Sequence, residues 1–150
     1  MLFRSDAVTV SGTANFSQAN AGSSLGYTLS NLALSGNDAT NYLLSGGTSY
    51  SGNDGQINKA NATVTANSST VTYTGQAQSV TGFTATGLVN NETAAVLTGV
   101  TTSGGSGTNA ATYAHTISGT AANYNLTLVN GSLTIDPAAL TITEIGRAHV

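Results

Sequence analysis

His115 is the residue of this sequence best suited to acid–base chemistry, because the second histidine lies in the C-terminal tail. A Ser-His-Asp arrangement would need a carboxylate beside it, and Asp136 or Asp38 could supply one. Serine and threonine are so frequent that no single hydroxyl stands out as a nucleophile. His115 falls between Tyr113 and Ile117 on one face of a predicted strand, which is typical of a packed or edge-exposed histidine. We therefore predict no catalytic residue and no enzyme.

Two acidic segments, Asn37-Asp38 and Asn53-Asp54-Gly55, could bind a cation. Neither has the several spaced carboxylates that a calcium site needs. No second histidine or carboxylate cluster near His115 supports a transition-metal site. Both segments are more typical of turns, and Asp54-Gly55 suits a tight hairpin turn. The sequence predicts no metal and no cofactor.

Two other segments could carry chemistry. The glycine-rich stretch 103–107 is followed by neither a lysine nor a helix start, so it predicts a flexible loop and not a nucleotide site. Lys59 could form an intramolecular isopeptide bond, but its counterpart in the repeat described below is Pro137. We expect no covalent crosslink there.

The six tyrosines could line a sugar-binding face, because aromatic faces stack on the apolar faces of sugars. Tyr42 and Tyr124, however, recur at matching positions of an internal repeat. That recurrence favours a structural role, in which the tyrosine hydroxyl bonds to the backbone as in a tyrosine corner.

The composition limits the class of protein. Charged residues make up 6% of the 150 residues and hydrophobic residues 39%, whereas about 25% are charged in an average soluble domain. A net charge of −3 with three basic residues excludes nucleic acid and anionic membranes as partners. No apolar run approaches the ~18 residues of a spanning helix, so we expect no membrane insertion. Abundant Thr, Val and Tyr favour an all-β fold.

The sequence contains an internal repeat. Residues 57–65 return as residues 135–143, at an offset of 78 residues. Three other landmarks agree at slightly longer offsets: Leu34-Ser35-Gly36 with Ile117-Ser118-Gly119, Asn41-Tyr42 with Asn123-Tyr124, and Asn20-Ala21 with Asn109-Ala110. The repeat predicts modules that differ by a small loop insertion.

These repeats predict the domain organisation. Residues 6–58 would be the C-terminal part of a first β module, residues 59–137 a complete module, and residues 138–143 the first strand of a third. Pro137, the only proline, would stiffen the second boundary.

The two ends, residues 1–5 and 144–150, break the compositional pattern and carry both arginines. Back-translated, both segments resemble the arms of a common short-read sequencing adapter. We expect adapter-derived ends on a metagenomic fragment of a longer gene.

Within the modules, apolar and polar residues alternate with a period of two. Val8, Val10, Ala14 and Phe16 would share one face of a half-buried strand. Other predicted strands contain these pairs: Val64 with Ala66, Val71 with Tyr73, Tyr113 with Ile117, Leu126 with Leu128, Leu133 with Ile135, and Leu140 with Ile142.

The segment 90–97 is the exception, because Asn90 or Asn91 could cap a short helical turn there. We expect tandem small antiparallel β-sandwiches of the Ig-like kind. If the helical turn packs on a sheet, the module would be β-grasp-like.

Several short motifs carry a family resemblance. They are Thr63–Asn67 through Tyr73-Thr74-Gly75, Gly82-Phe83, Glu92-Thr93, Val96–Gly99, Asn109-Ala110 to Tyr113, Asn123-Tyr124 into Gly131–Ile135, and in the first module Val10–Phe16 and Leu34–Ala39. These motifs resemble the mostly-β, glycine-rich (MBG) domains and the related YDG domains of large bacterial surface proteins. The resemblance implies a filamentous-haemagglutinin-like adhesin of a Gram-negative bacterium, with no catalytic residues in these modules.

We therefore expect a non-catalytic repeat or stalk module of a large exported adhesin, located on the outside of the bacterial cell. Its partners would be neighbouring repeat modules of the same chain. The alternative is a module of the same kind of protein that binds host or matrix glycans.

Overall fold

The computed structural model describes residues 6–144 and 146, and 54% of the structure is β-strand. The all-β class predicted from the sequence is confirmed. The chain divides into two compact units, Met1–Lys59 (unit 1) and Ala60–Val150 (unit 2), one residue after the predicted module boundary. Residues 1–5, 145 and 147–150 lie outside the described residues, and most of the two predicted adapter segments lies there with them.

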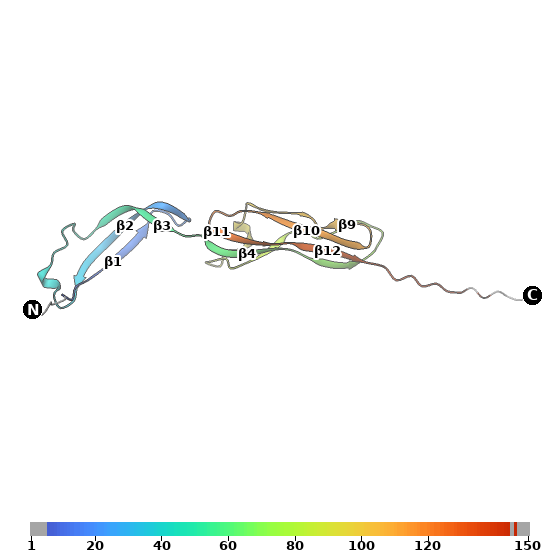
Figure 1. The fold of residues 1–150 in the computed structure, drawn as a ribbon, viewed down its shortest axis with the longest axis horizontal. Coiled ribbons are helices and arrows are strands. Elements are labelled where there is room, and N and C mark those ends of the chain that lie inside the picture. Colours follow the sequence, from blue (N-terminus) through green and yellow to red (C-terminus); the bar gives the residue numbers. More distant parts are fainter. Residues whose placement is uncertain (1–5, 145, 147–150) are drawn as a thin grey trace, which may run out of the picture. The chain divides into compact units, whose positions relative to one another are not determined.

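Unit 1 is a three-stranded antiparallel sheet in the order β1-β2-β3 (Figure 1). Its elements are β1 (Thr9–Phe16), β2 (Gly22–Ser35), the 3-10 turn η1 (Ala39–Asn41) and β3 (Tyr50–Ile57). A bulge interrupts the pairing of β1 with β2 near Asn31, whose φ is 54°. Asparagine tolerates this left-handed conformation better than most residues.

The prediction of a half-buried β1 was wrong, because all eight of its residues are exposed. The alternating pattern does form a strand, but among the described residues of unit 1 only Leu25 and Asp38 are buried. In the described part of unit 1, no second sheet packs on β1-β2-β3. One apolar face of this sheet therefore stays open.

Unit 2 has nine strands and one 3-10 turn within the described residues. They are β4 (Ala60–Ala66), β5 (Ser69–Thr72), β6 (Gln78–Ser79), β7 (Phe83–Thr86), η2 (Ala94–Val96), β8 (Val100–Gly104), β9 (Ser106–Gly107), β10 (Ala111–Gly119), β11 (Tyr124–Val129) and β12 (Gly131–Asp136). The strands form one sheet in the order β11-β4-β7, a second in the order β5-β12-β10-β8, and a small pair β6-β9.

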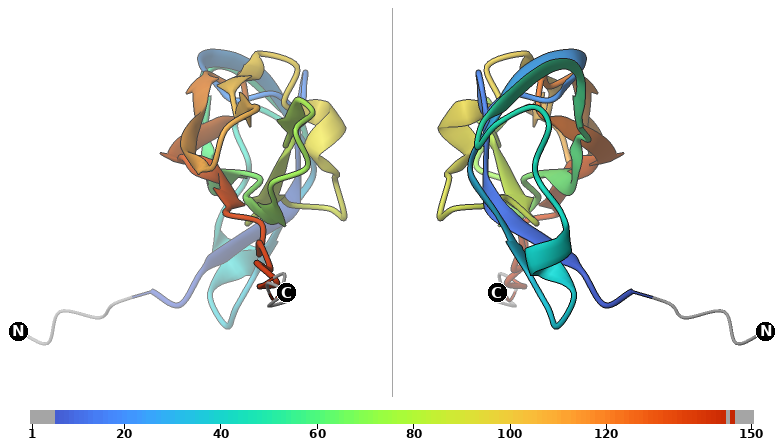
Figure 2. Two further views of the ribbon diagram at one scale, coloured as in Figure 1. Left: turned by 90° about the vertical axis from the view of Figure 1, so that its right-hand side faces the viewer. Right: turned by 90° about the vertical axis from the view of Figure 1, so that its left-hand side faces the viewer.

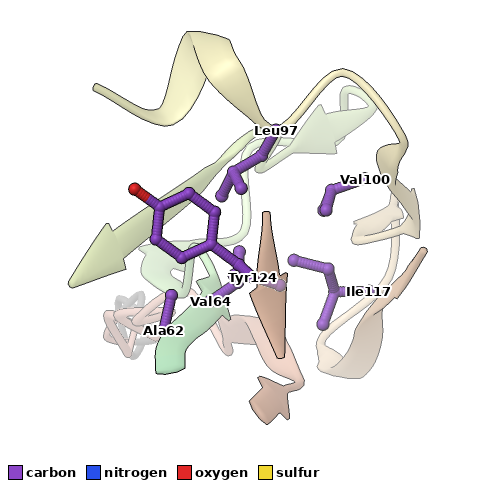
Figure 3. Packing of buried hydrophobic residues seen from close by; sticks show 7 residues of the cluster. Ala62, Val64, Leu97, Val100, Ile117 and Tyr124 are labelled. Atoms are coloured by element: carbon purple, nitrogen blue, oxygen red, sulfur yellow. The ribbon is translucent and has the colours of Figure 1, made fainter. Parts of the chain in front are cut away.

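The core of unit 2 lies between its two larger sheets. Figure 3 shows side chains from both sheets and from the segment after η2 converging on one interior, and Figure 2 shows the strands of the unit end-on. The buried cluster consists of Ala62, Val64, Ala66, Leu97, Val100, Ile117 and Tyr124. The predicted sandwich is thus observed, and no helix crosses a sheet in the described residues as a β-grasp fold would require.

The pairing differs from the purely antiparallel one expected. β4 pairs with β11 in parallel, and so does β5 with β12. Period-two alternation is the same for parallel and antiparallel strands, so the sequence pattern did not distinguish them.

Three local predictions need correction. The helical turn exists as η2, but Thr93 precedes it, while Asn90 and Asn91 adopt positive φ and do not cap it. Asp54-Gly55 lies inside β3 and forms no hairpin turn. The stretch 103–107 is not a loop: it ends β8 and forms β9, with a buried Gly105 between them.

The C-terminal segment 138–143 forms no strand in this structure. Leu140 and Ile142 are 85% and 86% exposed. A strand is held by hydrogen bonds to a neighbouring strand, and none of the described strands pairs with this segment. The third module that was predicted to start here stays a prediction.

Candidate functional site

His115 is a structural residue of β10. It is 1% exposed, and its Nδ1 lies 2.8 Å from the backbone oxygen of Asn67. Because a carbonyl only accepts hydrogen bonds, this nitrogen carries the proton. The sequence favoured a packed or edge-exposed histidine, and the structure shows the packed one.

Asp136, one of the two carboxylates proposed as partners for His115, does not reach it. His115 lies opposite Gly131, five residues before Asp136, so Asp136 is about 17 Å along the strand from His115. Asp38 belongs to unit 1, where it is buried and accepts the Ala7 N–H at 2.9 Å. The described residues contain no group of three side chains able to hold a metal ion.

Tyr124 forms the most developed polar contact of unit 2. Its side chain is 4% exposed, and its hydroxyl accepts the Val89 N–H at 3.1 Å while donating to the Glu92 carboxylate. The bond to Glu92 raises the pKa of Tyr124, the backbone N–H lowers it, and burial adds a smaller rise. The tyrosine corner expected from the repeat is found here, with a carboxylate added, and it fixes the loop between β7 and η2 to β11.

The repeat-matched Tyr42 of unit 1 makes a similar contact. Its hydroxyl donates to the carboxylate of Asp6, and this bond raises its pKa. Tyr42 is 48% exposed, however, because no sheet of the described residues covers it. The hydrogen bond is repeated in unit 1, but the burial is not.

An aromatic row crosses the sheet of unit 1. The rings of Phe16 and Tyr27 lie 6.3 Å apart, and those of Tyr27 and Tyr50 lie 6.4 Å apart. The Phe16 and Tyr27 rings also cover Gly55 and Gly52 of β3, where an added Cβ would come within 2.5 Å of either ring. Three aromatic residues from three strands thus share one surface, whereas the six tyrosines of the chain do not form one group.

The first and last strands of unit 2 form a parallel pair with a constant register. Every paired residue of β11 or β12 lies 64 positions after its partner in β4 or β5, from Ala60 opposite Tyr124 to Thr72 opposite Asp136. The pair therefore spans 13 residues, about 40 Å. Because the two strands are parallel, the chain enters unit 2 at one end of the pair and leaves it at the other (Figure 1).

At residues 66–68 and 130–132 the two paired segments pass from the sheet β11-β4-β7 into the sheet β5-β12-β10-β8. We call this place the crossing. Three hydrogen bonds hold it: His115 to the Asn67 oxygen, the Ile117 N–H to Asn130 Oδ1 at 3.0 Å, and the Ser132 N–H to Ser68 Oγ at 3.1 Å. A Cβ on Gly131 would lie 2.3 Å from the Asn67 oxygen and 2.4 Å from that of Ala66. Only glycine permits this close approach.

Sequence reasoning missed this strand pair. The signal available was that apolar alternation begins at residue 60 and recurs just before residue 137, so that both ends of the module are strands. That pattern does not reveal that the two strands are neighbours.

The open face of unit 1 contains an apolar groove of about 370 Å³. It is lined by Leu29, Leu32, Leu43, Leu44, Ser45, Gly46, Gly47, Ser49 and Tyr50. Leu43 is 84% exposed and Tyr50 58%. Leu29, Leu32 and Leu44 in the same groove are partly buried, so this apolar surface is incompletely covered and can take another element.

Two family models match parts of the chain. Residues 62–134 match the model of the MBG domain (YGX type), and residues 1–50 match the model of the YDG domain. The YDG match includes residues 1–5, so the adapter origin of that segment stays a prediction. Neither a curated protein nor a solved structure matches the chain.

Proposed function

Since this chain carries a YDG domain followed by an MBG domain of the YGX type, we propose that it is a non-catalytic stalk segment of a larger exported bacterial adhesin. Domains of these two kinds are repeat modules typical of extracellular surface proteins. The segment would lie outside the bacterial cell, with neighbouring repeat modules of the same chain as its partners. No helix in the described part of the chain is long and apolar enough to cross a membrane.

The parallel pair of first and last strands is the observation that supports a stalk. A stalk transmits tension from one end of each module to the other. Tension on unit 2 pulls β4 and β5 towards residue 60, and β11 and β12 towards residue 136, in opposite directions along the same pair. All hydrogen bonds of the pair are then loaded together in shear, and they must break together before the strands separate.

The direction of pulling tests this role. The chain has no cysteine, so pairs of introduced cysteines can define the points of attachment. Asn58→Cys with Pro137→Cys loads the pair in shear, whereas Asn58→Cys with Ala122→Cys pulls its strands apart from one end. All three residues are exposed.

In single-molecule pulling of the full chain, we expect a clearly higher unfolding force for unit 2 in the first geometry. In the second geometry the hydrogen bonds break one after another, so each step needs less force. Equal forces in the two geometries would contradict the stalk proposal. Thermal unfolding of both cysteine variants serves as the control, because their stabilities should match.

A glycan-binding module is the second candidate, and the aromatic row of unit 1 favours it. Exposed Phe16 and Tyr50 flank Tyr27 on one surface, and such surfaces stack on sugar rings. A saturable signal on a glycan array that is lost in Phe16→Ser, but kept in Tyr73→Ser of unit 2, would support this candidate. The absence of any signal from the unaltered chain would favour the spacer.

A further inference from the structure

Unit 1 corresponds to one part of unit 2. The internal repeat places β2 on β10 and β3 on β12, and both long strands end at a glycine of positive φ, 113° at Gly36 and 137° at Gly119. The sheet order β1-β2-β3 then matches β8-β10-β12. In unit 2 the sheet continues with β5 beyond β12, and β4 packs across it. The described residues of unit 1 contain no counterpart of β4 or β5.

The counterpart of β4 would lie on the apolar groove. In unit 2, β4 buries Ala62 and Val64 to 4% and 0% exposure and pairs with β11, which contains Leu126. The residue of unit 1 that matches Leu126 is Leu44, two residues after Tyr42 as Leu126 is two after Tyr124. Leu44 lines the groove together with the more exposed Leu43. The groove is thus the place that β4 fills in the other unit.

The chain itself contains a second copy of the β4 sequence. Residues 138–143 repeat residues 60–65, with Leu140 and Ile142 at the positions of Ala62 and Val64. The segment has the alternating pattern of a β-strand, but it forms no strand in this structure. Its two large apolar side chains are more than four-fifths exposed. One chain therefore carries an open β4 site and an unpaired β4-like segment.

We propose that residues 138–143 of a second copy of this chain dock in the groove of unit 1 as a β-strand, in the place that β4 occupies in unit 2. Residues 137–142 span at most about 21 Å when extended. That is half the length of the strand pair between Asp136 and Ala60, where unit 1 joins. Because the segment is this short, a donor segment from a second copy is favoured over the segment of the same chain.

The low charge of the chain makes this docking easier. Natural proteins protect sheet edges with lysines and other charges, and this sequence has one lysine. The donor offers polar Thr141 and Thr143 on one face and apolar Leu140 and Ile142 on the other. Its apolar face suits the leucines of the groove, and its backbone can pair with the segment around Leu44, as β4 pairs with β11 in unit 2.

Sedimentation of the full chain over a range of concentrations tests the proposal. We expect reversible head-to-tail association of the unaltered chain. The double variant Leu140→Asp, Ile142→Asp should weaken association more than about tenfold, because it places charge against an apolar surface. Both side chains are exposed, so neither unit loses a core contact. The matched control Thr141→Asp, Thr143→Asp changes the other face and should weaken association much less.

Leu43→Asp tests the acceptor, because Leu43 lines the groove and is too exposed to support the fold. The donor double variant and Leu43→Asp should each be monomeric alone, yet form a one-to-one complex when mixed. A monomeric unaltered chain, or association that survives the donor variant, would overturn the proposal. If the chain is monomeric and the donor variant speeds the hydrogen exchange of residues 29–50, the segment docks within its own chain. That result would also overturn the proposal.

Discussion

The hydroxyl of Tyr124 donates a hydrogen bond to the carboxylate of Glu92, although the two residues lie 32 positions apart in the sequence. The same hydroxyl accepts the N–H of Val89, so one side chain holds both ends of the segment that precedes η2. Its ring meanwhile belongs to the buried cluster between the two sheets. The residue joins the core of unit 2 to the irregular segment between β7 and η2.

Tyr124→Phe is expected to destabilise unit 2 by about 1–3 kcal/mol, because the ring stays while Val89 and Glu92 lose their partner. Urea unfolding monitored by circular dichroism measures the loss. Tyr73→Phe, at a tyrosine of the same unit that is 40% exposed, is the matched control and should change stability by less. Equal stabilities of the two variants would contradict the role given to Tyr124.

Unit 2 is expected to lose stability at alkaline pH through Tyr124. Its hydrogen bond to Glu92 raises its pKa in the folded state, whereas the unfolded value lies near 10. Above about pH 10 the unfolded chain releases this proton first, so the stabilising contribution is complete below that pH and falls as the pH rises further. Urea midpoints at about pH 8 and pH 11 should differ less in Tyr124→Phe than in Tyr73→Phe. An identical alkaline loss in both variants would exclude Tyr124 as its source.

Gly131→Ala is expected to destabilise unit 2 by about 3 kcal/mol or more, because the new Cβ meets two backbone oxygens that cannot rotate away. Gly46→Ala is the control, since a Cβ there meets no atom within 4 Å. Both variants can be followed by thermal unfolding of the full chain. A Gly131→Ala protein as stable as Gly46→Ala would show that the crossing is looser than described.

His115→Leu is expected to cost about 1–3 kcal/mol, because the Asn67 oxygen at the crossing loses its donor. His115→Gln retains a donor of similar reach and should restore part of the stability. The measurement is again unfolding by urea. If the leucine variant were the more stable of the two, packing of the side chain and not its hydrogen bond would explain the burial of His115.

The sequence predicted the features that depend on local patterns. Alternation identified β1 and β12, and matching positions singled out Tyr42 and Tyr124. Features set by distant contacts were not predicted. Asp54 resembles a turn residue but lies in β3, because pairing of β3 with β2 overrides the local preference.

Burial was the hardest property to predict. The alternation in β1 equals that of a half-buried strand, yet its exposure depends on whether a second sheet is present. Likewise, no residue pattern shows that the strands at the two ends of the module are neighbours. Both properties are set by residues far from the strand itself.

The parallel pair also determines the order in which unit 2 can fold. Among the described strands, β5 pairs with β12 alone, so this early strand gains its partner only with the last strand of the unit. A chain delivered from its N-terminus, during synthesis or passage through a narrow pore, therefore cannot complete the unit until residue 136 has emerged. Unit 2 therefore stays incompletely folded until its last strand has emerged, and only then can all of its strands pair.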